Sequence, residues 1–469
     1  MEMSGPIERV VMSNEAPLPK SPRGKAIHRF LRLFTDVRPE EMTKALLLTF
    51  NIFALLAAYY MLKAVREGLI LSRFPAQLTS YIQAGQAVLL IFVAKAFSRM
   101  ASRAPRHILI ARVTLFFMSN LALFYVVHAV GLSGKGLGIV FFGWVGIFNV
   151  TVIAQFWAFA NDLYTAEAGK RLFPLIAFGA TFGGFFGSQL TDWLKTSRSV
   201  YDMMLVAAAI LGLCIGLTFI IHRRDVRPRT ALTAPEAGPA AAAGAEAEKP
   251  VGPGGAFQLL ARNRYLLAIA FFVLLLNFVN TNGEYIWRRV VQQAAAAAGG
   301  ASSEGFITGV YAQFNVIMNL WAMIVQLFVV SRVFKWFGVR AALFFLPVIS
   351  LGGYAAIGLG ASFVLVKWVK ALENGSDYSI MNTTRHALFL VASRREKYKA
   401  KAAVDTFFHR SGDALSAVLV FLGTVPLSFR VETFAVINVA AIVAWIAVGA
   451  VIVRRHKALT AEKPVEGGV

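Results

Sequence analysis

The sequence is short of cysteine and of charge. One of its 469 residues is a cysteine, Cys214, which excludes an intrachain disulfide and a cysteine-based metal cluster. Charged residues make up 15% of the chain and hydrophobic residues 57%, whereas an average soluble domain carries about a quarter charged residues. So little polar surface cannot cover a water-soluble globule of this length, so the composition predicts a polytopic membrane protein.

Patterns for ATP hydrolysis and for catalysis are also missing. The chain contains no GxxxxGK[ST] segment, which argues against the ATPase site of a pump. It also has no nucleophile with a base, and no set of metal ligands, at usable spacing. We therefore expect neither an enzyme nor a protein with a metal or cofactor.

What the chain has instead is a series of apolar windows. Each is long enough to cross roughly 30 Å of hydrocarbon at about 1.5 Å per residue. We place twelve spans, at residues 44–65, 78–97, 107–130, 136–160, 172–192, 202–221, 264–286, 306–330, 341–360, 362–382, 402–427 and 432–453. The expected fold is an all-α polytopic membrane protein of about twelve transmembrane helices.

Positive charge is concentrated on one side of these spans. The chain has 47 Lys and Arg against 25 Asp and Glu, a net charge of +22. Most of the cations lie in the basic tail 1–43, the even-numbered connections and the tail 454–469. By the positive-inside rule, both termini are expected in the cytoplasm. The charge then reflects topology and contact with the anionic bilayer, and nucleic-acid binding is not needed to explain it.

A segment of different composition divides the spans into two groups of six. Residues 223–262 are rich in Ala, Pro, Gly and Glu and have no apolar periodicity, which predicts a flexible cytoplasmic linker. The linker separates an N-terminal half, 44–222, from a C-terminal half, 263–453.

A weak internal repeat supports this division. Tyr81 recurs as Tyr311 at an offset of 230 residues, and Gly183 recurs as Gly412 at an offset of 229. Two six-helix repeats joined by a central linker are typical of major-facilitator-type transporters, whose substrate site lies near the bilayer midplane. We expect such a protein to be a monomer.

Charges inside the spans are the candidates for mechanism, because each costs about 2.5–3.5 kcal/mol at the bilayer centre. In the first span Tyr59, Lys63 and Arg66 share a helix face, with Glu67 adjacent. Two cations and a phenol on one face predict an anion-binding site. The alternative is that Lys63 and Arg66 extend to the outer headgroups.

The seventh span has a similar group at the equivalent place. Asn277, Asn280 and Glu284 share a face, and Trp287 with Arg288 marks the membrane interface. Glu284 is expected to pair with a first-span cation when the outer mouth closes. The alternative is a permanent structural ion pair.

The tenth span is the most heavily charged. On a straight helix Lys367, Lys370, Glu373 and Asp377 form one stripe, and Arg385 lies beyond it at the inner mouth. Lipid cannot accept this stripe, so it faces either a water-filled pathway or charged neighbours, including partners on the same helix. The functional and structural interpretations are equally open.

The eleventh span carries Asp405, His409 and Asp413 four residues apart, with Arg410 beside them. A ladder of carboxylates and histidine can carry protons. We favour the alternative, a cytoplasmic gate in which these groups pair with basic loop residues such as Arg99, Arg103, Lys170 or Arg171.

An aromatic cluster ends the fourth span. Phe156 and Trp157, close to Asn161, suit stacking on a planar base. Anchoring at the membrane interface explains them as well.

Four segments of the chain resemble one family. YYMLKAVREGLIL is similar to the motif that opens the ATP/ADP translocases of obligate intracellular bacteria and plastids. QFWAFANDLYTAEAGKRLFPL resembles that family's FWxFAN and EAKRFYPL segments, and NTNGEYIWRRV resembles its seventh-span motif. DYSIMNTTRHALFLVASRREKYKAKAAVDTFFHRSGDALSA resembles its tenth- and eleventh-span motifs, so the likeness runs from about residue 45 to 425.

The resemblance implies a twelve-span, major-facilitator-like exchanger whose basic residues hold nucleotide phosphates. Carried over position by position, Lys63, Arg66 and Arg385 contact phosphate and Glu284 balances them. The sequence departs from the family pattern at His386, where the family has Glu, and at Thr181, where it has Asn.

The function expected from the sequence is secondary transport, by alternating access across the bacterial inner membrane, of a nucleotide or another phosphorylated or anionic small molecule. One alternative is a proton-coupled major-facilitator carrier of an unrelated small molecule. Another is a non-transporting membrane partner protein, in which the charged stripe of the tenth span is a buried interhelical network.

Overall fold

A computed structural model describes residues 38–101, 105–132, 134–229, 258–260, 262–299, 303–389, 400–401 and 403–461. The tail 1–37 and most of the expected linker lie outside these ranges. In the described residues the secondary structure is helical throughout, with no strand. The all-α membrane fold expected from the sequence is therefore confirmed.

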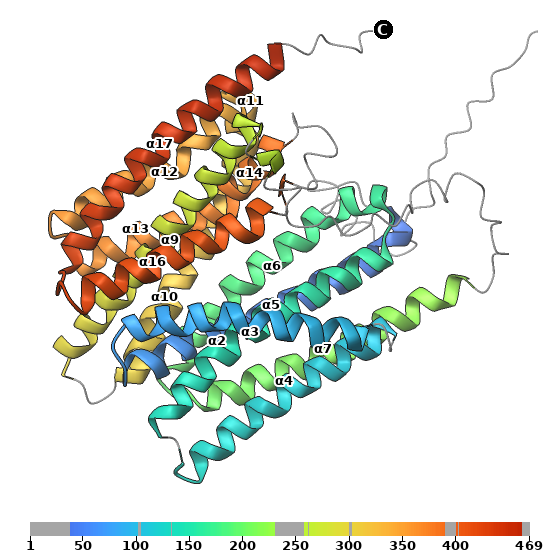
Figure 1. The fold of residues 1–469 in the computed structure, drawn as a ribbon. Coiled ribbons are helices and arrows are strands. Elements are labelled where there is room, and N and C mark those ends of the chain that lie inside the picture. Colours follow the sequence, from blue (N-terminus) through green and yellow to red (C-terminus); the bar gives the residue numbers. More distant parts are fainter. Residues whose placement is uncertain are drawn as a thin grey trace, which may run out of the picture.

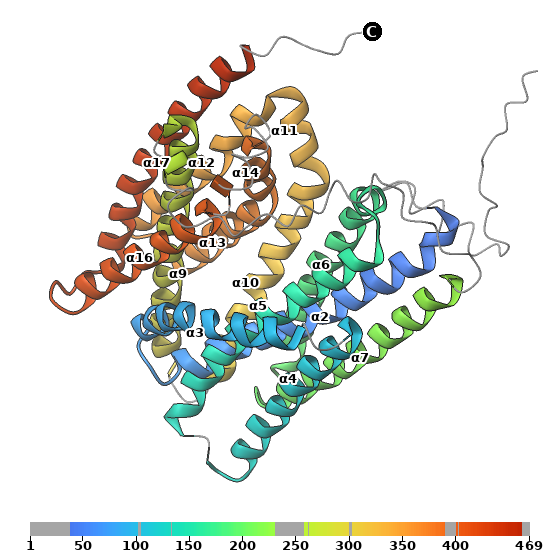
Figure 2. The ribbon, with the colours of Figure 1, turned by 45° about the vertical axis from the view of Figure 1, so that its right-hand side comes forward.

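The helices form two groups, which lie side by side in Figures 1 and 2. The N-terminal half consists of α2 (Pro39–Leu71), α3 (Gln77–Ala101), α4 (Arg106–Ala129), α5 (Lys135–Leu163), α6 (Ala166–Leu194) and α7 (Asp202–Arg229). The C-terminal half consists of α9 (Arg264–Ala297), α10 (Ser303–Ile324) continued by η2 (Val325–Val329) and α11 (Val330–Trp336), α12 (Gly338–Gly358), α13 (Phe363–Ser376) continued by η3 (Asp377–Met381) and α14 (Asn382–Leu388), η5 (Val404–Phe408) continued by α16 (His409–Thr424), and α17 (Val431–Ala461).

Several helices extend beyond the spans expected from hydropathy. Helix α2 begins at Pro39, inside the expected tail, and α7 continues to Arg229, inside the expected linker. A helix does not stop where the hydrocarbon stops, because its backbone hydrogen bonds continue into the headgroup region.

Eight of the described helices are long and apolar enough to cross a membrane by composition alone. Four helical segments are too short or too polar to meet this criterion: α3, α6, the α13–η3–α14 segment and the η5–α16 segment. Three of these four lie where the halves meet: α6 packs on α10, and α3 packs on α16.

Two glycines display the internal repeat in three dimensions. A Cβ on Gly183 of α6 would lie 2.2 Å from the backbone oxygen of Phe53 in α2, and one on Gly412 of α16 would lie 2.5 Å from that of Leu274 in α9. Equivalent helices of the two halves thus approach backbone to backbone at equivalent places, as small residues permit in membranes. A side chain at either position would force the helices apart.

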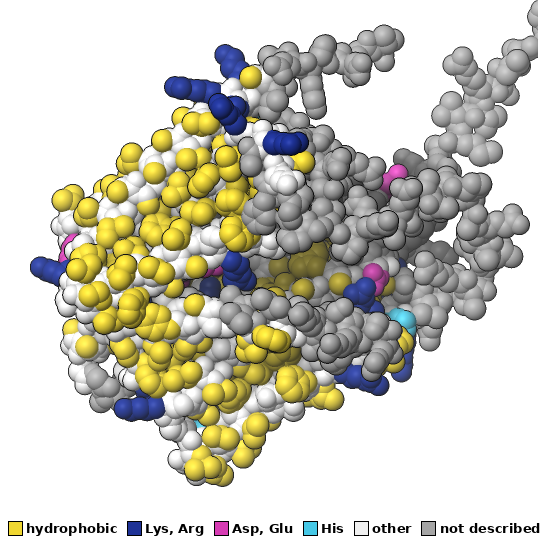
Figure 3. Space-filling model, in the orientation of Figure 1, with side chains coloured by type: hydrophobic (Ala, Val, Ile, Leu, Met, Phe, Trp, Pro, Cys, Tyr) yellow, Lys and Arg dark blue, Asp and Glu magenta, His cyan; other side chains and the backbone are white. Residues whose placement is uncertain are grey.

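The molecule has two distinguishable ends. We call the linker end the one where α2 and α9 begin and α7 and α17 end, and the distal end the one where α2 and α9 end. The halves diverge towards the linker end in both ribbon views (Figures 1 and 2). The space-filling view is hollowed between the halves, with Lys, Arg, Asp and Glu side chains around the hollow (Figure 3).

Candidate functional site

A buried ion triad joins the two halves near the distal end. Glu67 of α2 accepts a hydrogen bond of 2.6 Å from Arg66 and one of 3.2 Å from Arg288 of α9. Glu67 is 1% exposed and Arg288 2%, so both are removed from water and from headgroups. The Arg66 guanidinium also lies 4.4 Å from the ring centre of Phe142. This pairing reverses the sequence expectation, because the carboxylate comes from α2 and the cation from α9.

The carboxylate of Glu284 has different partners from those expected. It lies 3.6 Å from the ammonium of Lys370 and accepts a 2.8 Å hydrogen bond from Asn374, both on α13. Glu284 therefore binds within its own half in this structure. No direct ion pair joins Glu284 to a first-span cation among the described residues, although Lys63 attracts its carboxylate at longer range.

Lys370 and Glu373 form the second buried ion pair, at 2.9 Å along one helix face. Lys370 also donates to the side-chain oxygen of Asn280 at 2.9 Å. Glu373 accepts further hydrogen bonds from Tyr354 at 2.8 Å and Ser350 at 3.3 Å. Lys370 and Glu373 of the expected charged stripe thus belong to a hydrogen-bonded network inside the C-terminal half. Such a network offsets the cost of burying the two charges in the membrane.

Lys63 differs from the other cations of this region. It is half-buried, and in the described part of the chain its ammonium has neither a direct ion pair nor a hydrogen bond. It lies 5.2 Å from the ring centre of Tyr60 and is attracted at longer range by the carboxylates of Glu284 and Glu67. Tyr59 packs edge-on against Tyr60 at 5.3 Å, and Tyr378 of η3 is 51% exposed. Among the described residues, Lys63 is therefore a cation without a direct carboxylate partner, next to an aromatic ring.

The remaining residues of the tenth-span stripe are less tightly held. Lys367 donates to Gln313 at 3.5 Å, and Asp377 has no ion pair among the described residues. Asp377 also begins a π-helical segment, whose wider i to i+5 turn breaks the straight-helix geometry assumed from sequence. The stripe therefore does not continue unchanged from Glu373 to Asp377.

Charges at the linker end pair within each half. Arg385 lies 3.5 Å from Asp405, and Arg410 lies 3.4 Å from Asp413, which also accepts a 2.7 Å hydrogen bond from Thr281. Asp405 lies in the π-helical η5 and His409 begins α16, so the four-residue ladder is interrupted by a register shift.

The one candidate gate partner whose side chain is described is not bound to these residues, so the gate stays a prediction. Its candidate partner Arg171 binds Glu41 of its own half at 3.0 Å. The side chains of the other basic candidates, Arg99, Arg103 and Lys170, lie outside the described residues.

The aromatic cluster of α5 packs into the hydrophobic core and against α6. Phe156 is 4% exposed and belongs to the hydrophobic core, and Trp157 packs edge-on against Phe173 at 5.8 Å. Asn161 is exposed beside Asp162, which pairs with Arg106 at 2.8 Å. A buried Phe156 offers no face to a base in this state, so core packing explains it better.

Sequence reasoning missed a set of contacts that close the distal end. The side-chain nitrogen of Gln292 in α9 donates to the backbone oxygens of Leu71 at 2.8 Å and Phe74 at 2.7 Å, and its oxygen accepts from the backbone nitrogen of Ala76 at 3.1 Å. Arg73 pairs with Glu304 of α10 at 2.7 Å. No pattern marks Gln292, which stands at the edge of an alanine-rich helix end.

The fold and the placement of its charges define a secondary membrane transporter. Among solved structures, a mutant form of the nucleoside transporter NupG matches with a TM-score of 0.60 over 87% of this chain and 99% of that chain, at 12% identity. A bacterial homologue of the iron transporter ferroportin, in an inward-facing state, matches with a TM-score of 0.59 over 88% and 99%, at 11% identity. These likenesses confirm the transporter fold.

The chain belongs to the family described as TLC ATP/ADP transporter, whose pattern matches residues 140–456. The ADP,ATP carrier protein 5 of Rickettsia felis is 22% identical over 83% of this chain and 89% of its own length. The ADP,ATP carrier protein 2 of Chlamydia trachomatis is 23% identical over 93% and 92%. The resemblance seen in the sequence motifs is confirmed at the level of the family.

Proposed function

We propose that this protein exchanges nucleotides of the ATP and ADP type across the bacterial inner membrane by alternating access, as a monomer. The linker end faces the cytoplasm in this proposal, because most Lys and Arg of the tails and connections belong to that side. The structure then represents a state that is closed on the outside.

The observation that carries the proposal is the unpaired ammonium of Lys63. Each of the neighbouring cations has a carboxylate partner, at 2.6 Å for Arg66, 3.2 Å for Arg288 and 2.9 Å for Lys370. A cation kept without a partner inside a membrane protein costs free energy unless a ligand supplies the anion. The phosphates of a nucleotide supply it, and family membership makes nucleotides the best candidate anion.

The same geometry suggests how substrate binding is coupled to the opening of the distal end. Lys63 and Arg66 lie about one turn apart on α2, so a polyphosphate bound to Lys63 can reach the Arg66 guanidinium. Phosphate oxygens would then compete with Glu67 for Arg66 and loosen the triad that includes Arg288. Bound substrate would stabilise the opening of the distal end, whereas the empty protein keeps it shut, which is the requirement for exchange.

Counterflow in proteoliposomes tests the proposal. Vesicles loaded with ADP should take up labelled ATP, and Lys63→Ala should lower this uptake by at least about tenfold, because a charged hydrogen bond to phosphate is worth about 1.5–3 kcal/mol. Lys135→Ala, which removes an exposed cation at the start of α5, is the matched control and should transport normally. No counterflow with any nucleotide would refute nucleotide exchange, and normal counterflow in Lys63→Ala would refute the site.

Two further measurements separate the alternatives. Uptake driven by an imposed pH gradient without internal nucleotide would indicate proton-coupled transport. Absence of thermal stabilisation by any nucleotide, together with absence of transport, would indicate a non-transporting partner protein.

A further inference from the structure

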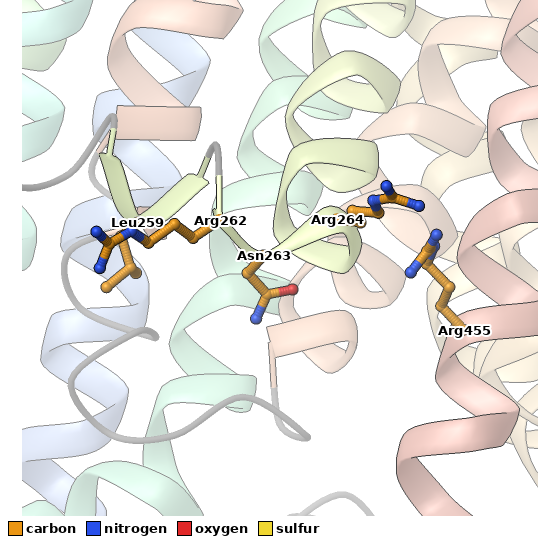
Figure 4. A pocket seen from close by; sticks show the side chains of 5 residues that line it. All are labelled: Leu259, Arg262, Asn263, Arg264 and Arg455. Carbon is orange, nitrogen blue, oxygen red and sulfur yellow. The ribbon is translucent and has the colours of Figure 1, made fainter.

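A basic cavity lies at the linker end of the C-terminal half, far along α9 from the charge network. Its volume is about 550 Å³, and its lining consists of Leu259, Arg262, Asn263, Arg264 and Arg455. Three of the five lining side chains are arginines, and none is acidic. Figure 4 shows Arg264 and Arg455 pointing towards one another across the space between α9 and α17.

The arginines of this cavity lack anionic partners. In the part of the chain that the structure describes, none of the three arginines forms an ion pair with Asp or Glu. Two guanidinium groups that face each other repel, and side-chain freedom would ordinarily let them turn away into water. A bound anion removes this repulsion, and the planar guanidinium suits the oxygens of a phosphate.

The level of the cavity in the membrane indicates which phosphate compound it binds. Asn263 caps the start of α9 by accepting hydrogen bonds from the backbone nitrogens of Tyr265 at 3.0 Å and Leu266 at 3.3 Å. The apolar window of α9 begins directly after this cap, and that of α17 ends just before Arg455, with Ile452 fully buried. The cavity therefore lies where hydrocarbon gives way to headgroups. Lys and Arg side chains also gather over this end of α17 in Figure 3.

We infer that this cavity binds the phosphate group of an anionic phospholipid of the adjacent leaflet, held between Arg264 and Arg455, whereas Arg262 points away from this pair and adds only positive charge nearby (Figure 4). Basic pockets between helices at this level recognise acidic headgroups through the same chemistry. The acyl chains of such a lipid would lie along the apolar surfaces of α9 and α17. The inference is independent of the transported substrate, because it concerns a different face of the C-terminal half.

Binding of a short-chain phosphatidylglycerol to the purified protein in neutral detergent tests the inference, with phosphatidylcholine of the same chains as the comparison. Each cation near an anionic lipid contributes roughly a fivefold factor in affinity, so Arg264→Ala/Arg455→Ala should weaken phosphatidylglycerol binding by about 30-fold. The doubly conservative variant, Lys at both positions, should retain most of the affinity. Arg223→Ala/Arg224→Ala is the matched control, since it removes two exposed arginines at the linker end of α7 in the other half.

The outcomes distinguish a lipid from a soluble anion. Preference for phosphatidylglycerol over phosphatidylcholine that is lost in the cavity variant, and kept in the control, supports the inference. Equal phosphatidylglycerol binding by the wild type and the cavity variant overturns it. Inorganic phosphate that binds through the same arginines as tightly as phosphatidylglycerol also overturns the assignment to lipid. Thermal unfolding in neutral detergent checks that the variants fold, without reference to transport.

Discussion

The two ends of the molecule use charge in different ways. At the distal end, the ion pairs of Glu67 with Arg288 and of Arg73 with Glu304 cross from one half to the other. At the linker end, the described pairs, such as Arg106 with Asp162 and Arg385 with Asp405, remain inside one half. Pairs that cross the boundary hold the halves together, whereas pairs within a half leave them free to separate. The comparison explains why the halves meet at one end and diverge at the other.

Removing the central charge of the distal end should have the largest effect. Glu67→Gln keeps the shape of the side chain but leaves Arg66 and Arg288 buried without a carboxylate, which costs about 3–5 kcal/mol for a buried pair. We expect a clear drop in thermal stability and loss of counterflow. Glu167→Gln, an exposed acid at the start of α6, is the control and should have little effect. Unchanged stability in Glu67→Gln would show that the triad does not hold the halves together.

A smaller effect is expected at Gln292. Gln292→Ala removes three hydrogen bonds to the backbone of the α2–α3 connection, each worth about 1 kcal/mol. Because these bonds exist when the distal end is closed, their loss should shift the population towards the opposite state. Gln293→Ala, at an exposed neighbouring position, is the matched control.

Cysteine labelling measures this shift. The native Cys214 is buried, so a cysteine introduced at Tyr81, near the distal contact with Phe421, can be labelled selectively. Faster labelling from the distal side in Gln292→Ala, and not in Gln293→Ala, is the expected result. Equal labelling rates in both variants would show that Gln292 does not contribute to the closure of the distal end.

The smallest effect should come from the linker end. Arg106 and Asp162 are 39% and 49% exposed, and pairs of this kind contribute about 0–1 kcal/mol. Arg106→Ala should therefore change neither thermal stability nor distal labelling by a measurable amount, and counterflow should persist. A destabilisation comparable to that of Glu67→Gln would contradict the contrast between the two ends.

Much of the fold could be predicted from the sequence because it depends on local properties. Apolar windows, the composition of the linker region and the repeated glycines Gly183 and Gly412 are all visible without coordinates, and the helices lie where the windows indicated. Hydropathy failed at helix ends such as Pro39 and Arg229, since helical hydrogen bonding continues outside hydrocarbon. The domain boundaries themselves stay predictions where they fall outside the described residues.

The site was harder to predict because partners are chosen across the fold. Periodicity correctly placed Lys63, Arg66 and Glu67 close together on α2, but not the arginine that Glu67 would bind. It placed Asp405, His409 and Asp413 on one ladder because it assumed a straight α-helix, and the π-helical η5 breaks that assumption. Gln292 had no sequence signal, since its function depends on backbone atoms of another segment.

The sequence by itself determined that this chain is a helical membrane transporter of two repeated halves and which charges lie at membrane depth, because hydropathy, charge bias and repeats are properties of composition and order. Only the tertiary structure decided which of those charges satisfy one another and which, like Lys63, have no direct ion pair among the described residues. The physical reason is that ion pairs depend on distances of 3–4 Å between atoms from distant segments, and packing alone sets those distances.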